Sequence, residues 1–151
     1  MIRIGIDASR IRSFGAISHL VNIIKYGDPK VHKISEVHLW THKKLLNSIP
    51  DKDWLAKHSH PDLEKNLIKQ ILWQFFKLPE LIKKERINVL FTADATTLCK
   101  FNKMVVMSQD LLPYEPKIVL ESRNIKFILR NIALFFIQNR AFKNATSVIF
   151  L

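Results

Sequence analysis

The sequence predicts an α/β protein built on a parallel, doubly wound sheet. Apolar segments of strand length alternate along the chain with segments of helical periodicity, which is the order of βα units. The segment 87–92, INVLFT, is almost entirely apolar, as expected of a parallel strand covered on both faces. The chain has 151 residues and no internal repeat, which is typical of one domain covering 1–151.

The first residues predict a strand, a loop and a helix in succession. Isoleucine alternates with other residues in segment 2–7, and apolar residues recur at helical spacing over 17–24. A polar loop over 8–14 separates them, and Gly27-Asp28-Pro29 marks the end of the helix. Such a unit places backbone N–H groups at a helix start near the end of a strand, where open α/β sheets bind ligands.

The rest of the chain continues the alternation. A helix is expected to begin near Asp62 and to be kinked or split at Pro79, and segment 47–57 is interpreted as irregular. One long helix is expected over 117–143. The further strands are expected at 36–41, 87–92, 104–107 and 147–151. Since the last strand ends with the sequence, we interpret the chain as part of a longer protein.

The charge is strongly basic. Lys and Arg number 24 against 13 Asp and Glu, a net charge of +11 that attracts nucleic acid, an anionic membrane or phosphorylated substrates. A basic surface without a specific partner is the alternative. Cys99 is the single cysteine, so no disulfide can form within the chain. With no visible signal peptide or spanning segment, we expect a cytoplasmic protein that can contact the inner face of the cell membrane.

Two N-terminal segments carry a family resemblance. Residues 3–8 read RIGIDA, and residues 15–20 read GAISHL. They resemble the RIGIDAR strand and GGIGRY loop with which family 4 glycosyltransferases of the GT-B fold begin. Gly15 is retained, whereas Ala16, Ser18 and His19 replace the second glycine, the third glycine and the arginine of that pattern.

Two later segments follow in the family's order. Segment 104–116, MVVMSQDLLPYEP, resembles the family's VVTVHDLIPL, and segment 130–151 resembles its basic helix followed by A-D-x-V-I-x-x-S. The resemblance therefore spans the chain, although segment 41–85 resembles the family only in its general character and contains no family motif. Gln109 stands where the family usually has a histidine near the transferred sugar and the acceptor. Glutamine can donate and accept hydrogen bonds but cannot transfer a proton.

The resemblance implies the acceptor-side, Rossmann-like N-terminal domain of a retaining glycosyltransferase that needs no metal. The nucleotide-sugar donor would be a substrate rather than a cofactor, and the acceptor a saccharide or lipid-linked saccharide in cell-surface polysaccharide or glycolipid assembly. The C-terminal domain that binds the donor is absent from this chain, so the chain alone should be nearly inactive. The implied catalytic positions are Gln109 and Asp110, and the implied substrate-binding positions are Asp7, Gly15, Ala16, Ile17 and Ser108.

Each of these positions also has a purely structural interpretation. Asp7 and Asp110 could cap the turns that follow their strands, and Gly15 could simply begin a helix. No metal-ligand spacing occurs among the histidines, so a metal site is not expected. Ser108 has no nearby histidine in a nucleophile-elbow pattern, which argues against hydrolase chemistry.

The predicted helix over 117–143 carries a basic stripe. Arg123, Lys126 and Arg130 are expected on one face, at spacings of three and four, with Ile125, Ile128, Ile132 and Phe135 opposite. The stripe is interpreted either as the solvated side of a core helix, or as a contact for anionic lipid or an acceptor's phosphates. Segment 67–76, with aromatics among lysines, is a second candidate membrane surface.

Two other function classes remain open at this point. A nucleic-acid-binding α/β domain is suggested by the net charge of +11, but the lysines are dispersed and no nucleic-acid motif is present, so we expect no nucleic-acid partner. A noncatalytic remnant or interaction module is compatible with Gln109 in place of histidine.

Overall fold

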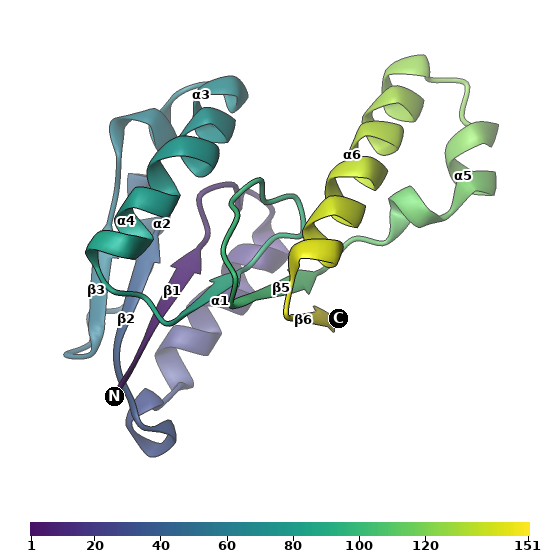
Figure 1. Cartoon of the computed structure of the whole chain (residues 1–151). Coiled ribbons are helices and arrows are strands. Elements are labelled where there is room, and N and C mark those ends of the chain that lie inside the picture. Colours follow the sequence, from purple (N-terminus) through teal and green to yellow (C-terminus); the bar gives the residue numbers. More distant parts are fainter.

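The computed structural model describes residues 1–151 and contains one six-stranded, fully parallel sheet with the order β3-β2-β1-β4-β5-β6 (Figure 1). This is the doubly wound order, in which the chain builds outward from β1 to one edge, returns to β4 and then builds to the other edge. The predicted fold class is confirmed. The strands are β1 (Ile2–Asp7), β2 (Ile34–Trp40), β3 (Leu55–His58), β4 (Val89–Thr92), β5 (Met104–Ser108) and β6 (Ser147–Phe150).

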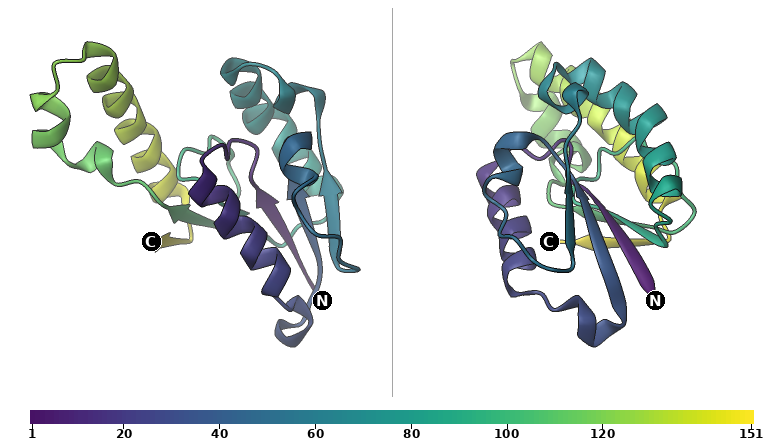
Figure 2. Two further views of the ribbon diagram at one scale, coloured as in Figure 1. Left: turned by 180° about the vertical axis from the view of Figure 1, so that it is seen from behind. Right: turned by 90° about the vertical axis from the view of Figure 1, so that its left-hand side faces the viewer.

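Helices lie on both faces of the sheet. Seen along the sheet in Figure 2, α1 lies on one face, whereas α3, α4 and α6 lie on the other. None of the helices combines the length and the apolar character that crossing a bilayer requires. The helices are α1 (Phe14–Tyr26), α2 (Lys43–Leu46), α3 (Leu67–Leu72), α4 (Leu78–Lys84), α5 (Pro116–Glu121) and α6 (Ile125–Asn144).

The central strands separate two apolar cores. Alternate side chains of β1 and β2, such as Ile6 and Leu39, pack with Leu20 and Ile24 of α1. On the other face Leu90 lies in a second cluster. The remaining large members of that cluster are Trp40, Leu63, Trp73, Leu78, Ile82, Ile87, Met104 and Val106. Because apolar groups are buried on both faces, the central strands have the apolar sequences that predicted them.

The expectation that 47–57 is irregular is wrong at its end, where Leu55–His58 forms the edge strand β3. Its register places Leu55 beside Val37 and His58 beside Trp40. The ring of His58 stacks on Trp40 with centroids 5.3 Å apart. The sequence LAKH has no strong strand pattern, so long-range pairing and stacking produce this strand rather than local propensity.

Of the two outcomes expected at Pro79, a kink or a split, the split does not occur. The segments α3, Trp73–Lys77 and α4 follow one another without a break, and Trp73–Lys77 is a π-helical turn. Its wider spacing lets the Leu78 N–H donate to the Trp73 carbonyl, five residues back. Proline lacks an N–H and crowds the carbonyl four residues before it, and a π turn immediately before Pro79 relieves that crowding.

This helix also begins later than expected. Residues Pro61–Glu64 form a 3-10 turn, and α3 begins only at Leu67. The Asn66 side chain accepts a hydrogen bond from the Lys69 N–H at 3.1 Å, so Asn66 caps the helix.

The expectation of one helix over 117–143 is also wrong, because α5 and α6 are separate. The Asn124 side chain accepts a hydrogen bond from the Phe127 N–H at 3.2 Å and caps α6. The Ser122 hydroxyl accepts from the Asn124 N–H at 3.2 Å. Serine and asparagine thus offer the backbone local partners that compete with a continuous helix. Arg123 therefore lies between the helices and does not share a helical face with Lys126 and Arg130.

Candidate functional site

A pocket of about 320 Å³ lies at the carboxyl edge of the sheet. Its walls come from the loops after β1 and β4, from the start of α1, from the end of β5 and from α6. The strand order reverses between β1 and β4, and ligands of doubly wound sheets bind at that switch point. The lining residues fall in 10–13, 93–96 and 109–110, with Ala16, Arg130, Leu134 and Gln138.

The loop after β1 is held from below by Asp7, which is 3% exposed. Its Oδ1 accepts hydrogen bonds from the Ser9 N–H at 3.1 Å and the Ser9 hydroxyl at 2.6 Å. Its Oδ2 accepts from Gln74 Nε2 at 2.8 Å. Burial raises the pKa of Asp7 despite these bonds. Asp7 thus lies beneath the pocket lining and has a loop-holding role.

Three arginines line the pocket, and none of them is in an ion pair. Arg10 Nη1 donates to the Thr96 carbonyl at 2.9 Å, which ties the β1 loop to the β4 loop. Arg12 Nη1 donates to the Ile11 carbonyl at 2.7 Å. Partial burial lowers the pKa of Arg12, but a guanidinium remains charged near neutral pH. Arg130 is contributed by α6.

The two carboxylates of the pocket are occupied by local hydrogen bonds. Asp94 accepts from the Thr96 N–H at 2.9 Å and from the Thr96 hydroxyl at 2.6 Å. Asp110 Oδ1 accepts from the Leu112 N–H at 2.9 Å. Because three guanidinium groups face two engaged carboxylates, the pocket has the character of an anion site.

An unpartnered acceptor adds a second chemical feature. Gln138 is only 3% exposed, and its Nε2 donates to the Asp110 carbonyl at 3.2 Å. Its Oε1 lacks a hydrogen-bond partner. A buried amide oxygen is costly to leave unpaired, so this atom suits a ligand that donates, such as a hydroxyl.

Only some of the residues at the start of α1 line the pocket. Ser13, which has no side-chain capping bond, and Ala16 belong to the lining. A Cβ on Gly15 would meet nothing within 4 Å, so its surroundings do not require glycine. Ile17 packs against the apolar core of the α1 face.

The end of β5 likewise contributes some of its predicted residues. Gln109 is exposed, and its Nε2 lies 3.4 Å from the Ala93 carbonyl. Ser108 is buried, 1% exposed, and is not in the lining. Of the predicted positions, the pocket therefore unites Ala16, Gln109, Asp110 and Arg130, and it leaves out Asp7, Gly15, Ile17, Ser108, Arg123 and Lys126.

Sequence reasoning missed Arg10, Arg12 and Gln138. The two arginines stand in a polar loop before a helix start, which is a signal that could have identified them. Gln138 gives no such signal, because its place depends on how α6 packs against the loop after β5.

Other reactive groups do not offer a second chemistry. Burial raises the pKa of the Cys99 thiol to about 12, so it is not a nucleophile at neutral pH. No group of three or more His, Cys, Asp or Glu side chains is placed to hold a metal ion.

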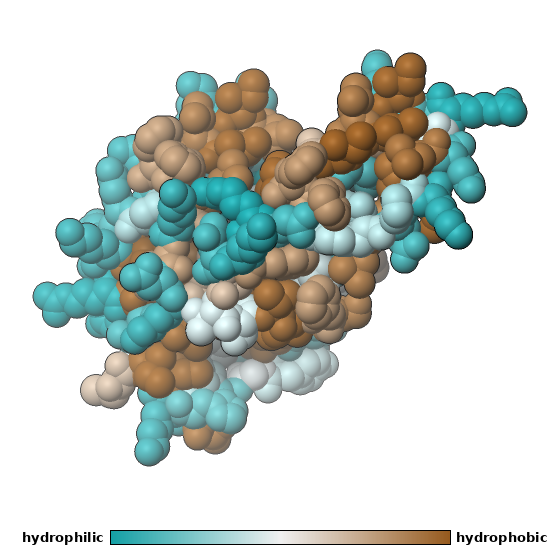
Figure 3. Space-filling model, turned by 45° about the vertical axis from the view of Figure 1, so that its right-hand side comes forward, coloured by the Kyte–Doolittle hydropathy of each residue, from teal (hydrophilic) through white to brown (hydrophobic).

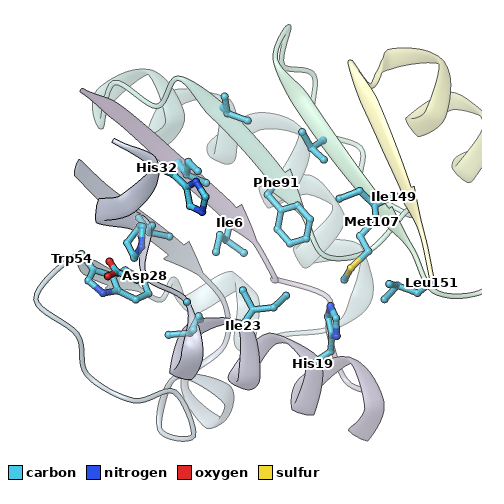
Figure 4. A pocket seen from close by; sticks show the side chains of 17 residues that line it. Ile6, His19, Ile23, Asp28, His32, Trp54, Phe91, Met107, Ile149 and Leu151 are labelled. Atoms are coloured by element: carbon cyan, nitrogen blue, oxygen red, sulfur yellow. The ribbon is translucent and has the colours of Figure 1, made fainter. Parts of the chain in front are cut away.

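A separate apolar groove of about 510 Å³ lies on the sheet face that carries α1 (Figure 4). Ile23 of α1 borders it, and Phe91, Met107 and Ile149 line it from the strands. It has almost no polar surface and lies along a face of the sheet rather than at its carboxyl edge. The polar pocket is therefore the better candidate for a functional site.

No protein-family model, curated protein or solved structure matches this chain.

Proposed function

We propose that this chain is the acceptor-side domain of a glycosyltransferase. It would serve transfer of a sugar from a nucleotide-sugar donor to a saccharide or lipid-linked acceptor, in cell-surface polysaccharide or glycolipid assembly. The observation that carries the proposal is one pocket at the switch point that joins Ala16, from the first resembling segment, to Gln109 and Asp110, from the second.

The lining residues suit binding and positioning of such substrates. Arginines bind phosphate oxygens through paired N–H groups, and the Gln138 Oε1 can accept from a sugar hydroxyl. The Gln109 amide can orient a hydroxyl, but it cannot remove its proton. In this proposal the chain positions the acceptor, and a second domain holds the nucleotide sugar. The reaction would take place in the cytoplasm, at the inner face of the cell membrane for a lipid-linked acceptor.

The proposal predicts binding at this pocket in solution. Titration of ¹⁵N-labelled chain with glucose 1-phosphate, a water-soluble substitute for the sugar and phosphate of a lipid-linked acceptor, should shift the amide resonances of residues 10–16, 93–96 and 109–110 first. Arg130→Ala should weaken this binding about tenfold or more, because a charge-assisted hydrogen bond is lost. Arg86→Ala is the matched control, since Arg86 is an exposed arginine outside the pocket, and its affinity should equal that of wild type.

Other outcomes would favour the competing functions. Shifts with maltose but none with glucose 1-phosphate would indicate a noncatalytic saccharide-binding module. Tight binding of a single-stranded oligonucleotide, falling steeply with salt and insensitive to Arg130→Ala, would indicate a nucleic-acid-binding domain. Absence of shifts with both sugar probes would contradict a sugar-binding pocket.

A further inference from the structure

The exposed large apolar side chains gather on two projections of the molecule. Of 21 such residues, five lie in 67–76 and seven in 111–136. Both segments extend past the carboxyl edge of the sheet in the same direction (Figure 1). In the space-filling view they form two hydrophobic prominences separated by a notch (Figure 3). Such grouping is unlike the scattered exposed apolar residues of an ordinary surface.

The outer face of α6 is apolar along most of its length. Residues 125, 129, 132 and 136 are spaced by four, three and four positions, which places them on one face. Asn131, Gln138 and Ala141 are the buried residues on the inner side. Ile125 and Ile132 are therefore exposed, which argues against the alternative that their side of the helix packs in the core. The exposed fractions are 71% for Ile125, 61% for Leu129, 41% for Ile132 and 66% for Phe136.

Basic residues accompany both apolar faces. The helix α6 contains no acidic residue, and none of its basic side chains is in an ion pair. Segment 65–77 has three lysines and no acid, although Lys65 pairs with Asp62 and Lys77 with Glu80. Interfaces between proteins are depleted in lysine, whereas anionic headgroups attract it. The basic side chains of α6 are Lys126, Arg130, Arg140 and Lys143.

We propose that the outer face of α6, together with Ile118 and Leu120 of α5, lies in the interface of an anionic lipid bilayer. The exposed side chains of α3 form a second contact. An amphipathic basic helix lies in the plane of the membrane, with its apolar residues among the acyl chains and its cations at the headgroups. Arg130 lines the pocket, and it is adjacent in sequence to Leu129 of the exposed apolar face. The pocket therefore lies close to the surface of α6 that would contact the membrane. This inference is independent of sugar transfer.

Vesicle sedimentation tests the inference directly. The chain should bind phosphatidylcholine vesicles that contain phosphatidylglycerol, bind pure phosphatidylcholine far more weakly, and lose affinity as salt is raised. Leu129→Glu combined with Phe136→Glu should reduce binding about tenfold or more. Val31→Glu is the matched control, because Val31 is 72% exposed and follows α1 on the other face of the sheet. Lys126→Glu should weaken binding about tenfold, and Lys25→Glu, on α1, should not.

Several results would overturn the inference. One is equal binding of wild type and the Leu129→Glu/Phe136→Glu variant, and another is equal binding to neutral and anionic vesicles. A third is a wild-type dimer that becomes monomeric with Phe136→Glu and binds no vesicle, which would assign this face to contact between copies. Circular dichroism should be unchanged in all variants, since every substituted side chain is exposed.

Discussion

Replacing Asp7 with alanine is expected to lower the free energy of unfolding by about 3 kcal/mol. The change removes the acceptor of four hydrogen bonds in a site that water does not reach. It leaves the Ser9 N–H, the Ser9 hydroxyl, the Gln74 amide and the Thr97 hydroxyl without that acceptor. Urea unfolding at neutral pH measures the loss. Since Asp7 anchors the loop that carries Arg10 and Arg12, ligand binding at the pocket should weaken in parallel.

Asp7→Asn is the informative companion variant. Its Oδ1 can still accept from Ser9, and its amide needs an acceptor where the second carboxylate oxygen stood. The Gln74 Oε1 has no partner, so the Gln74 amide can turn over and accept from Asn. Asparagine should therefore cost less than about 1 kcal/mol at neutral pH. A loss equal to that of alanine would contradict this description of the network.

Comparing the stability of the wild type with that of Asp7→Asn also tests the pKa of Asp7. Burial raises that pKa above its value in the unfolded chain. The stabilising contribution of the protonated group is then complete below the unfolded pKa of about 3.9, and it disappears as pH rises through the folded pKa. Relative to Asp7→Asn, the wild type should become more stable as pH falls from neutral to about 4. A pH-independent difference between the two proteins would show that the pKa of Asp7 is not raised.

Trp40→Ala should cost about 4 kcal/mol, because it removes a large side chain from the second core. Trp40 is 1% exposed, and its removal opens a large cavity between Gly5, Leu90 and His58. Gly5→Ala disturbs the same contact by overcrowding it, because the new Cβ would stand 2.8 Å from Trp40 Cζ3. The Trp40 ring is stacked on His58 and cannot easily give way, so Gly5→Ala should cost about 2 kcal/mol.

The two changes should partly compensate each other. With Trp40 gone, the Cβ on Gly5 no longer has its closest neighbour, although Ile87 at 3.1 Å still restricts it. The double variant should therefore be more stable than the sum of the single losses by about 1 kcal/mol. Guanidinium unfolding of the four proteins completes the cycle, with Val31→Ala as an exposed control that should change little. Strict additivity would mean that the contact between residues 5 and 40 is absent in solution.

The central strands were predictable because burial on both faces imposes an apolar sequence. Segments 2–7, 87–92 and 104–107 became β1, β4 and β5 with small changes of boundary. The edge strand β3 was not predictable, because its pairing with β2 and the stacking of His58 on Trp40 are contacts between distant residues. The π turn before Pro79 was not predictable either. The sequence indicates that proline disturbs a helix, but it does not indicate which distortion accommodates it.

The candidate site was half predictable for a similar reason. Parallel strands end at one edge of their sheet, so residues directly after β5, such as Gln109 and Asp110, and those at the start of α1 were expected to converge. The contribution of Gln138 required α6 to fold back over the loop after β5.

The sequence by itself thus determined the class of fold, the central strands and the edge of the sheet at which the candidate pocket lies, because these depend on local periodicity. Only the tertiary structure decided which loops meet at the pocket and which side of α6 faces outward. Periodicity identifies the residues that share a face of a helix, but the direction of that face depends on what the helix packs against. For α6 the buried side contains Asn131 and Gln138, and the apolar stripe is exposed.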